Sequence, residues 1–98
     1  MINLTEESKN NKFLVVDFFT EECGPCKTIS EIIDDLKNKY LDVKFMKVNA
    51  EECPQLSNEM ELSGVPTLLF FKDGLLKDRI NGFLPKNKIE NKIIEMIA

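Results

Sequence analysis

The amino-acid sequence predicts an α/β fold with a central mixed β-sheet flanked by helices on both faces, in three α/β/α layers. Two observations lead to this prediction. A strand, a long amphipathic helix and a second strand follow one another between residues 13 and 49, the order of a βαβ unit with parallel strands. Two later apolar runs flank an Asp-Gly pair, which favours an antiparallel hairpin. The 98 residues suit one core and no linker divides them, so we expect one domain over residues 1–98.

The first three elements have clear patterns. FLVVDFF at residues 13–19 is almost wholly apolar and predicts a central strand covered on both faces. VKFMKVN at residues 43–49 predicts a second strand. Between them, apolar residues spaced by three and four predict a helix over about residues 24–40: Ile29, Ile32, Ile33, Leu36 and Tyr40.

The second half of the chain predicts a short helix, a hairpin and a closing helix. The short helix is expected from Pro54 to about Leu62, and the hairpin strands are TLLFF and LLKDRI around Lys72-Asp73-Gly74. A weak extra element is expected near residues 2–4, with a turn of helix from Thr5. The closing helix carries a stripe of isoleucines: Ile89, Ile93, Ile94 and Ile97.

Charge and composition exclude several classes of function. The chain has 17 acidic and 13 basic residues, a net charge of −4, and no basic run that could neutralise a phosphate backbone, so we expect no nucleic-acid partner. No apolar run approaches the roughly 18–20 residues that cross a bilayer, and no export signal is recognisable, so we expect no membrane association and a cytoplasmic location. The absence of histidine excludes Ser-His-Asp catalysis and histidine-dependent zinc sites.

The chemistry is therefore expected at the cysteines, above all in the segment CGPC. Cys23 and Cys26 are three residues apart, so they can close a disulfide with little rearrangement. Gly24 and Pro25 begin the helix and place Cys23 at its N-terminus, where a thiolate is favoured and its pKa lowered, while Cys26 is shielded one turn further on. Half of a metal site is the alternative, and only Cys53 and carboxylates remain to complete it.

Five features follow one another along the chain: VVDFF, CGPCK, KVN, GVPTLLFFKDG and Gly82. Their order and spacing resemble those of the thioredoxin family over about residues 13–98. The resemblance implies the thioredoxin fold and a protein-disulfide reductase that exchanges a dithiol for a disulfide on protein substrates. It also implies that the chain binds no cofactor, that its redox group is the Cys23-Cys26 disulfide, and that an NADPH-dependent flavin thioredoxin reductase restores the dithiol. We expect a monomer.

The resemblance assigns Cys23 as the attacking cysteine, Cys26 as the resolving one and Asp17 as the buried aspartate. A carboxylate inside FLVVDFF would lose hydration, which raises its pKa toward neutrality, where it can exchange a proton with Cys26. Lys47 shares strand parity with Val43, which would turn it inward toward Asp17, as the family's matching lysine does. Periodicity alone equally allows a solvated lysine there.

A substrate surface follows from the same resemblance. Val65-Pro66 matches a loop that the family holds beside the disulfide with a cis proline, which would leave the Val65 backbone free to pair with an extended substrate. Gly64 and Gly82 are expected to serve backbone conformation and close approach near this surface. The expected substrate-binding residues are Gly24, Pro25, Gly64, Val65, Pro66 and Gly82.

The chain also departs from the family. Glu22, beside Glu21, stands where the family usually has tryptophan, so two carboxylates oppose the Cys23 thiolate; we expect slower attack and altered partner choice. This departure keeps a second function open, a redox-weak thioredoxin-fold binding module that recognises a protein partner.

Glu31 replaces a helix-kinking proline of relatives, so we expect a straighter helix. Cys53 has acidic neighbours and is expected to be inert.

Overall fold

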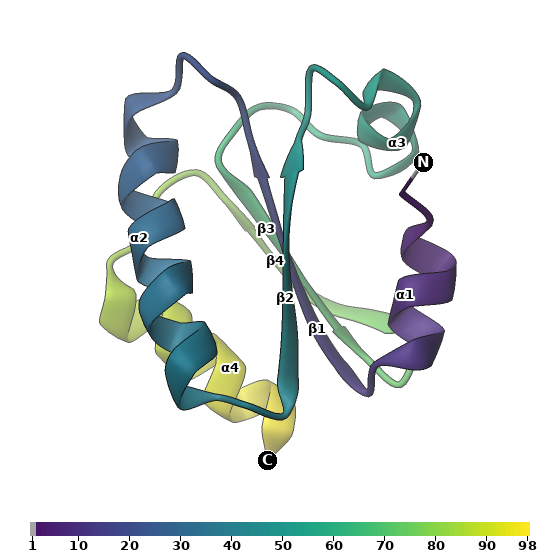
Figure 1. Ribbon diagram of the computed structural model, residues 1–98, viewed down its shortest axis with the longest axis vertical. Coiled ribbons are helices and arrows are strands. Elements are labelled where there is room, and N and C mark those ends of the chain that lie inside the picture. Colours follow the sequence, from purple (N-terminus) through teal and green to yellow (C-terminus); the bar gives the residue numbers. More distant parts are fainter. Residues whose placement is uncertain (1) are drawn as a thin grey trace.

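Four strands form one mixed sheet in the computed structural model, which describes residues 2–98 of the chain (Figure 1). The strands are β1 (Phe13–Phe19), β2 (Val43–Asn49), β3 (Thr67–Lys72) and β4 (Leu75–Asn81), in the spatial order β2-β1-β3-β4. β1 pairs with β2 in parallel and with β3 antiparallel, and β3 and β4 form the antiparallel hairpin. The helices are α1 (Leu4–Asn10), α2 (Gly24–Lys39), α3 (Pro54–Glu59) and α4 (Lys86–Ile97).

The helices cover both faces of the sheet, as predicted. α2 and α4 lie on one face and α1 and α3 on the other (Figure 1). β1 lies between two other strands and is buried on both sides, which is why its sequence is a continuous apolar run. Val15 packs in the core with Ile29 and Ile33 of α2, whereas Leu14 packs in the opposite core with Leu4 of α1. Each fully buried aliphatic side chain of this kind stabilises the fold by roughly 1.5–3 kcal/mol.

Two helices differ in extent from the sequence prediction. α1 is a helix of 7 residues, and the Asn3 side chain accepts a hydrogen bond from the Glu6 N–H at 3.0 Å at its start. Its pattern was weak because α1 offers a single leucine to the core and has no apolar stripe. α3 ends at Glu59, three residues earlier than expected. The chain leaves the helix through Glu61, whose φ of 55° is left-handed.

α2 runs unbroken from Gly24 to Lys39, past the exposed Glu31. Its end is tied to α4 by one carboxylate. The Tyr40 hydroxyl donates a hydrogen bond to Oε2 of Glu90 at 2.6 Å, and the Lys39 ammonium lies 2.6 Å from the same oxygen. These contacts join α2 to the helix packed beside it on the same face of the sheet.

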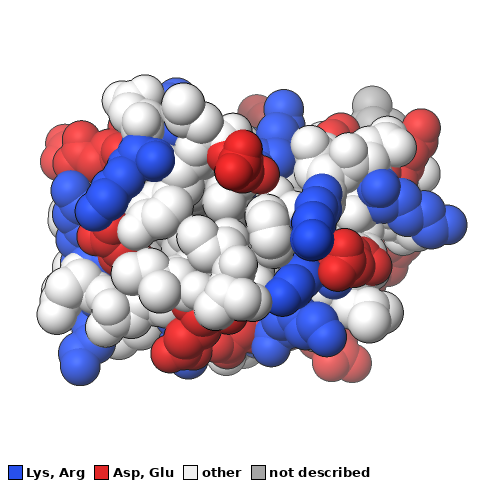
Figure 2. Space-filling model, turned by 90° about the horizontal axis from the view of Figure 1, so that it is seen from below, with Lys and Arg blue, Asp and Glu red and all other residues white. Residues whose placement is uncertain are grey.

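Charges of both signs are mixed at the end of the molecule where α2 ends and the C-terminus lies. Figure 2 shows this end, with uncharged side chains gathered in its centre and acidic and basic side chains interspersed around them. Neither sign forms a continuous area on this face. Among the helices of residues 2–98, none has the length and apolar character needed to cross a membrane.

Candidate active site

The two cysteines of CGPC lie at the start of α2 and form a disulfide, with their Cα atoms 5.2 Å apart. Cys23 is the residue that precedes the helix, and Pro25 lies in the first turn, where its missing N–H leaves no bond unmade. The Cys26 N–H donates a hydrogen bond to Sγ of Cys23 at 3.2 Å. The prediction that Cys23 caps the helix and lies within bridging distance of Cys26 is therefore confirmed.

The two sulfurs differ in their access to a partner. Cys23 is half-buried, whereas Cys26 is only 2% exposed. Gly24 and Pro25, between them, are exposed. An incoming disulfide can therefore reach Cys23, while Cys26 is placed to act from inside the protein.

Asp17 is a buried carboxyl group on β1. Its side chain is 1% exposed, and neither carboxyl oxygen has a hydrogen-bond partner among the described residues 2–98. Loss of hydration raises its pKa from 3.8 to about 6, against a smaller lowering by the Lys47 charge, while the Asp34 charge adds to the rise. The predicted rise in the pKa of Asp17 is confirmed.

Asp17 and Cys26 belong to the same interface between α2 and the sheet. Val15, two residues before Asp17 on the strand, packs against Ile29, and alternation along a strand puts Asp17 on that face too. Cys26 is buried three residues before Ile29, on the same side of α2. The helix begins at the sheet edge where β1 ends, so the two groups approach the same end of the layer (Figure 1).

Lys47 occupies the predicted face but not the predicted contact. It is the register partner of Asp17 across the parallel β1–β2 ladder. Its ammonium, however, lies 2.7 Å from Oδ1 of Asp34 and donates a hydrogen bond to the Ser30 hydroxyl at 2.7 Å. The Lys47 side chain is 33% exposed, and it extends toward α2 instead of turning inward to Asp17. Sequence reasoning missed Ser30 and Asp34, because an i, i+4 polar pair on a helix usually faces solvent.

The Val65-Pro66 peptide bond is cis, as the resemblance predicted. Pro66 is buried and Val65 half-buried. The Pro66 carbonyl accepts a hydrogen bond from the Gly82 N–H at 2.8 Å, which joins the loop to the end of β4. Within residues 2–98, no backbone hydrogen bond engages the N–H or C=O of Val65.

Gly82 and Gly64 differ in whether their backbone conformation requires a glycine. Gly82 has a φ of +95°, a left-handed conformation that other residues rarely adopt, so its predicted conformational role is confirmed. Gly64 does not have such a φ, and a Cβ added there would meet no atom of the chain within 4 Å, so the expectation of a conformational role is wrong for Gly64. Its expected close approach to a substrate stays a prediction. Its carbonyl accepts a hydrogen bond from the Thr67 hydroxyl at 2.7 Å, which any residue could do.

The acidic residues that precede the disulfide are both exposed. Glu21 accepts a hydrogen bond from the Asn49 side-chain amide at 3.5 Å, and Glu22 immediately precedes Cys23. Lys27, on the other side of the disulfide, is also exposed. The surface around Cys23 is thus acidic and lacks the apolar platform that a tryptophan would supply.

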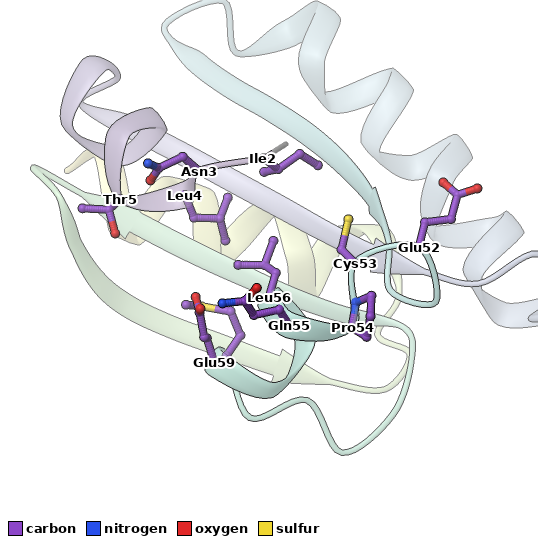
Figure 3. Close-up of a pocket in the computed structure, with 11 residues that line it drawn as sticks. Ile2, Asn3, Leu4, Thr5, Glu52, Cys53, Pro54, Gln55, Leu56 and Glu59 are labelled. Atoms are coloured by element: carbon purple, nitrogen blue, oxygen red, sulfur yellow. The ribbon is translucent and has the colours of Figure 1, made fainter.

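Cys53 lies on the other face of the sheet. It is half-buried at the start of α3 and packs with the core that contains Leu4 and Leu56. It borders a cavity of about 600 Å³ between the start of α1 and α3, where Leu4 and Leu56 point toward one another (Figure 3). The fold therefore does not bring Cys53 to the Cys23-Cys26 pair, and no group of three or more cysteine or acidic side chains within residues 2–98 is placed to hold a metal ion.

Comparison with known proteins gives one consistent result. A model of the family described as Thioredoxin matches residues 3–95. The chain is 39% identical over 80 residues to a thioredoxin of Mycoplasmoides gallisepticum, which covers 82% of this chain and 80% of that protein. It is 37% identical over 94 residues to the thioredoxin of Rickettsia prowazekii, covering 89% and 90% of the two chains. The oxidised crystal structure of mitochondrial thioredoxin 3 from Saccharomyces cerevisiae superposes with a TM-score of 0.87 at 34% identity, over 93% of this chain and 85% of that one.

Proposed function

Because this chain belongs to the thioredoxin family, we propose that it works in the cytoplasm as a reductant of protein disulfides, with Cys23 attacking and Cys26 resolving. The chain is a thiol-disulfide oxidoreductase, and members of its family act on disulfide-containing proteins. The observation that best supports the roles of the cysteines is their difference in burial at the helix start. Cys23 is accessible and accepts the Cys26 N–H, whereas Cys26 is enclosed.

The proposed reaction has two exchange steps. The Cys23 thiolate attacks one sulfur of the substrate disulfide, forming the Cys23–substrate bond and releasing the other substrate sulfur as a thiolate that takes a proton from solvent. Cys26 then loses its proton, and its thiolate attacks Sγ of Cys23, which releases the second substrate thiolate. Two electrons have passed from the dithiol to the substrate, and the Cys23-Cys26 disulfide of the structure is the oxidised product.

Asp17 is proposed to accept the Cys26 proton in the second step. It is buried in the same layer, its oxygens have no partner among the described residues, and its pKa of about 6 is near the working pH of a general base. Lys47, the fourth residue that the resemblance assigns to catalysis, contributes its positive charge from the neighbouring strand without touching Asp17.

The substrate is proposed to bind as an extended segment across the cis-proline loop. The Val65 N–H and C=O have no backbone partner within residues 2–98, so they can pair with a substrate strand as a sheet edge does. Gly24 and Pro25 are exposed next to Cys23 in the chain, Gly64 is exposed just before Val65, and the Gly82 N–H donates a hydrogen bond to the Pro66 carbonyl. The acidic Glu21 and Glu22 would favour substrates with basic residues next to their disulfide.

We also propose that the chain binds no cofactor of its own and is reduced by an NADPH-dependent flavin thioredoxin reductase. The redox group required for the exchange is the disulfide itself. The support for the reductase is family membership.

Turnover of a disulfide protein tests the function directly. The native protein with dithiothreitol should accelerate the reduction of insulin, and Cys23→Ser should abolish that acceleration. Cys26→Ser should instead accumulate a mixed disulfide, visible by mass spectrometry, because the resolving thiol is missing. Cys53→Ser is the matched control and should keep full activity, because Cys53 lies on the far face of the sheet. Substrate binding without turnover in the native protein would favour a binding module instead.

The direction of transfer is tested by the reduction potential of the Cys23/Cys26 pair. Equilibration in glutathione buffers, followed by alkylation and mass spectrometry, measures it in the Cys53→Ser variant. A reductant should give a value near about −270 mV, whereas a value of about −180 mV or above would indicate oxidase or isomerase work.

A further inference from the structure

Ser30 and Asp34, which bind the Lys47 ammonium, have no part in the exchange steps described above. Lys47 is the direct register partner of Asp17, the closest place from which a cation on β2 could reach that carboxyl group. It instead binds two side chains of α2, each at 2.7 Å. The carboxyl oxygens of Asp17 are buried, and neither has a hydrogen-bond partner among the described residues.

The contacts of the Lys47 ammonium show what directs it. Ser30 and Asp34 are one helical turn apart on α2, so both point toward the same side and take the ammonium between them. Asp34 is half-exposed and keeps much of its hydration, so its carboxylate stays ionised, and the two charges attract without burying either one. Lys37 also pairs with Asp34, at 3.5 Å, and its side chain is 54% exposed.

We propose that Asp34, with Ser30, is a positioning residue that holds the Lys47 ammonium away from Asp17 and so keeps Asp17 able to exchange a proton near neutral pH. The proposal rests on the function proposed above, because that proton is the one Cys26 loses in the resolving step. Asp34 touches neither cysteine, and its effect would pass through Lys47.

The charged and titratable groups around Asp17 support this inference. They are Lys47 on β2, and Asp34 and Cys26 on α2. The partner of Asp17 on β3 is the apolar Leu68, and α4 supplies only apolar side chains to this core. The Lys47 charge lowers the pKa of Asp17 and the Asp34 charge raises it, in agreement with the geometry.

Loss of Asp34 should therefore move the titration of Asp17 to lower pH. In Asp34→Asn the repulsion between the carboxylates disappears and the lysine is free to approach Asp17. The midpoint of the Asp17 titration, followed by carboxyl carbon NMR in the oxidised protein, should move to lower pH by about one pH unit. Asp34→Glu keeps the charge and should retain a titration close to that of the native protein. Ser30→Ala should shift it less, since Asp34 remains.

Two controls separate positioning from simple charge. Asp35→Asn removes the neighbouring charge on α2, which pairs with Lys86 at 3.6 Å, and should leave the Asp17 titration unchanged. In a Lys47→Met background, Asp34→Asn should shift the midpoint clearly less than in the native background, because the lysine it positions is gone. An equal shift in both backgrounds, an equal shift in Asp35→Asn, or no shift in Asp34→Asn would each overturn the proposal.

The same variants have a kinetic readout. The release of substrate from the mixed disulfide should show a pH midpoint that moves down with that of Asp17 in Asp34→Asn, and an unchanged profile would contradict a role in the resolving step. The NMR titration needs no turnover. A native protein that fails to reduce disulfides would refute the function, whereas the titration tests Asp34 independently.

Discussion

The Cys26 N–H donates a hydrogen bond to Sγ of Cys23 at 3.2 Å, so the backbone of the first turn of α2 is directed at the sulfur that a substrate reaches. In the reduced protein the same N–H and the positive end of the helix favour a thiolate on Cys23. The accessible sulfur and the activated sulfur are therefore the same atom. Cys26, one turn further, is enclosed against the sheet.

Alkylation should follow this difference. In reduced protein at neutral pH, a short pulse of iodoacetamide is expected to modify Cys23 before Cys26, because Cys23 is both more exposed and more readily ionised. Peptide mass spectrometry of the quenched protein measures the order. Cys53 serves as the internal comparison, since it is half-buried at the start of α3 and its side chain makes no capping hydrogen bond. Equal labelling of Cys23 and Cys26 would contradict the assignment of roles.

The stability of the folded protein should decrease as the pH rises, because of Asp17. Its pKa in the folded protein is about 6, above the ordinary 3.8, so the folded state binds more protons than the unfolded state between these values. The free energy of unfolding of the oxidised protein should therefore decrease through that window, by up to about 3 kcal/mol at pH 7. Denaturant titrations of native protein and Asp17→Asn across pH 3.5 to 7.5 measure it. The variant should lack this decrease, and curves that stay parallel would contradict the burial of an ionisable Asp17.

Gly82 and Gly64 should respond in opposite ways to alanine. Gly82→Ala places a Cβ on a residue with a φ of +95°, which should cost about 1–2 kcal/mol of stability and disturb the Pro66 loop that Gly82 holds. Gly64→Ala meets no atom within 4 Å and no positive φ, so it should be neutral or stabilising by about 0.4–1 kcal/mol. Thermal unfolding and insulin reduction of both variants check this. A larger loss of stability in Gly64→Ala would contradict the backbone geometry.

Glu22 should slow the first step through its charge. Glu22→Gln removes a negative charge next to the Cys23 thiolate, so the rate of attack on a disulfide should rise about two- to fivefold at low salt. The gain should shrink as salt screens the charge. Stopped-flow measurement of mixed-disulfide formation gives the rate, with Glu31→Gln, exposed further along α2, as the control for net charge.

Glu22→Trp tests the missing apolar platform as well as the charge. Because the negative charge next to Cys23 is removed, the pH at which Cys23 alkylation is half-maximal should fall. The tryptophan ring should also improve the affinity for apolar substrate segments. An unchanged alkylation profile would refute the idea that Glu22 opposes the thiolate.

The sequence by itself determined most of the fold and the pair of reactive cysteines. Periodicity is a local property, so the apolar run of β1, the stripe of α2 and the Asp-Gly turn predicted their elements within a residue or two. The position of Cys23 at a helix start follows from Pro25 alone, and the burial of Asp17 follows from its apolar neighbours. α1 was only partly predicted, since one leucine gives no period.

Only the tertiary structure decided which side chains from separate elements meet. Strand parity put Lys47 on the face of Asp17, but it could not choose between the buried carboxyl group and Asp34 on α2. That choice depends on the register of β2 beside β1 and on where α2 crosses them, because an ion pair forms where both charges keep their hydration. The separation of Cys53 from Cys23 likewise follows from the topology, which sends α3 to the opposite face of the sheet.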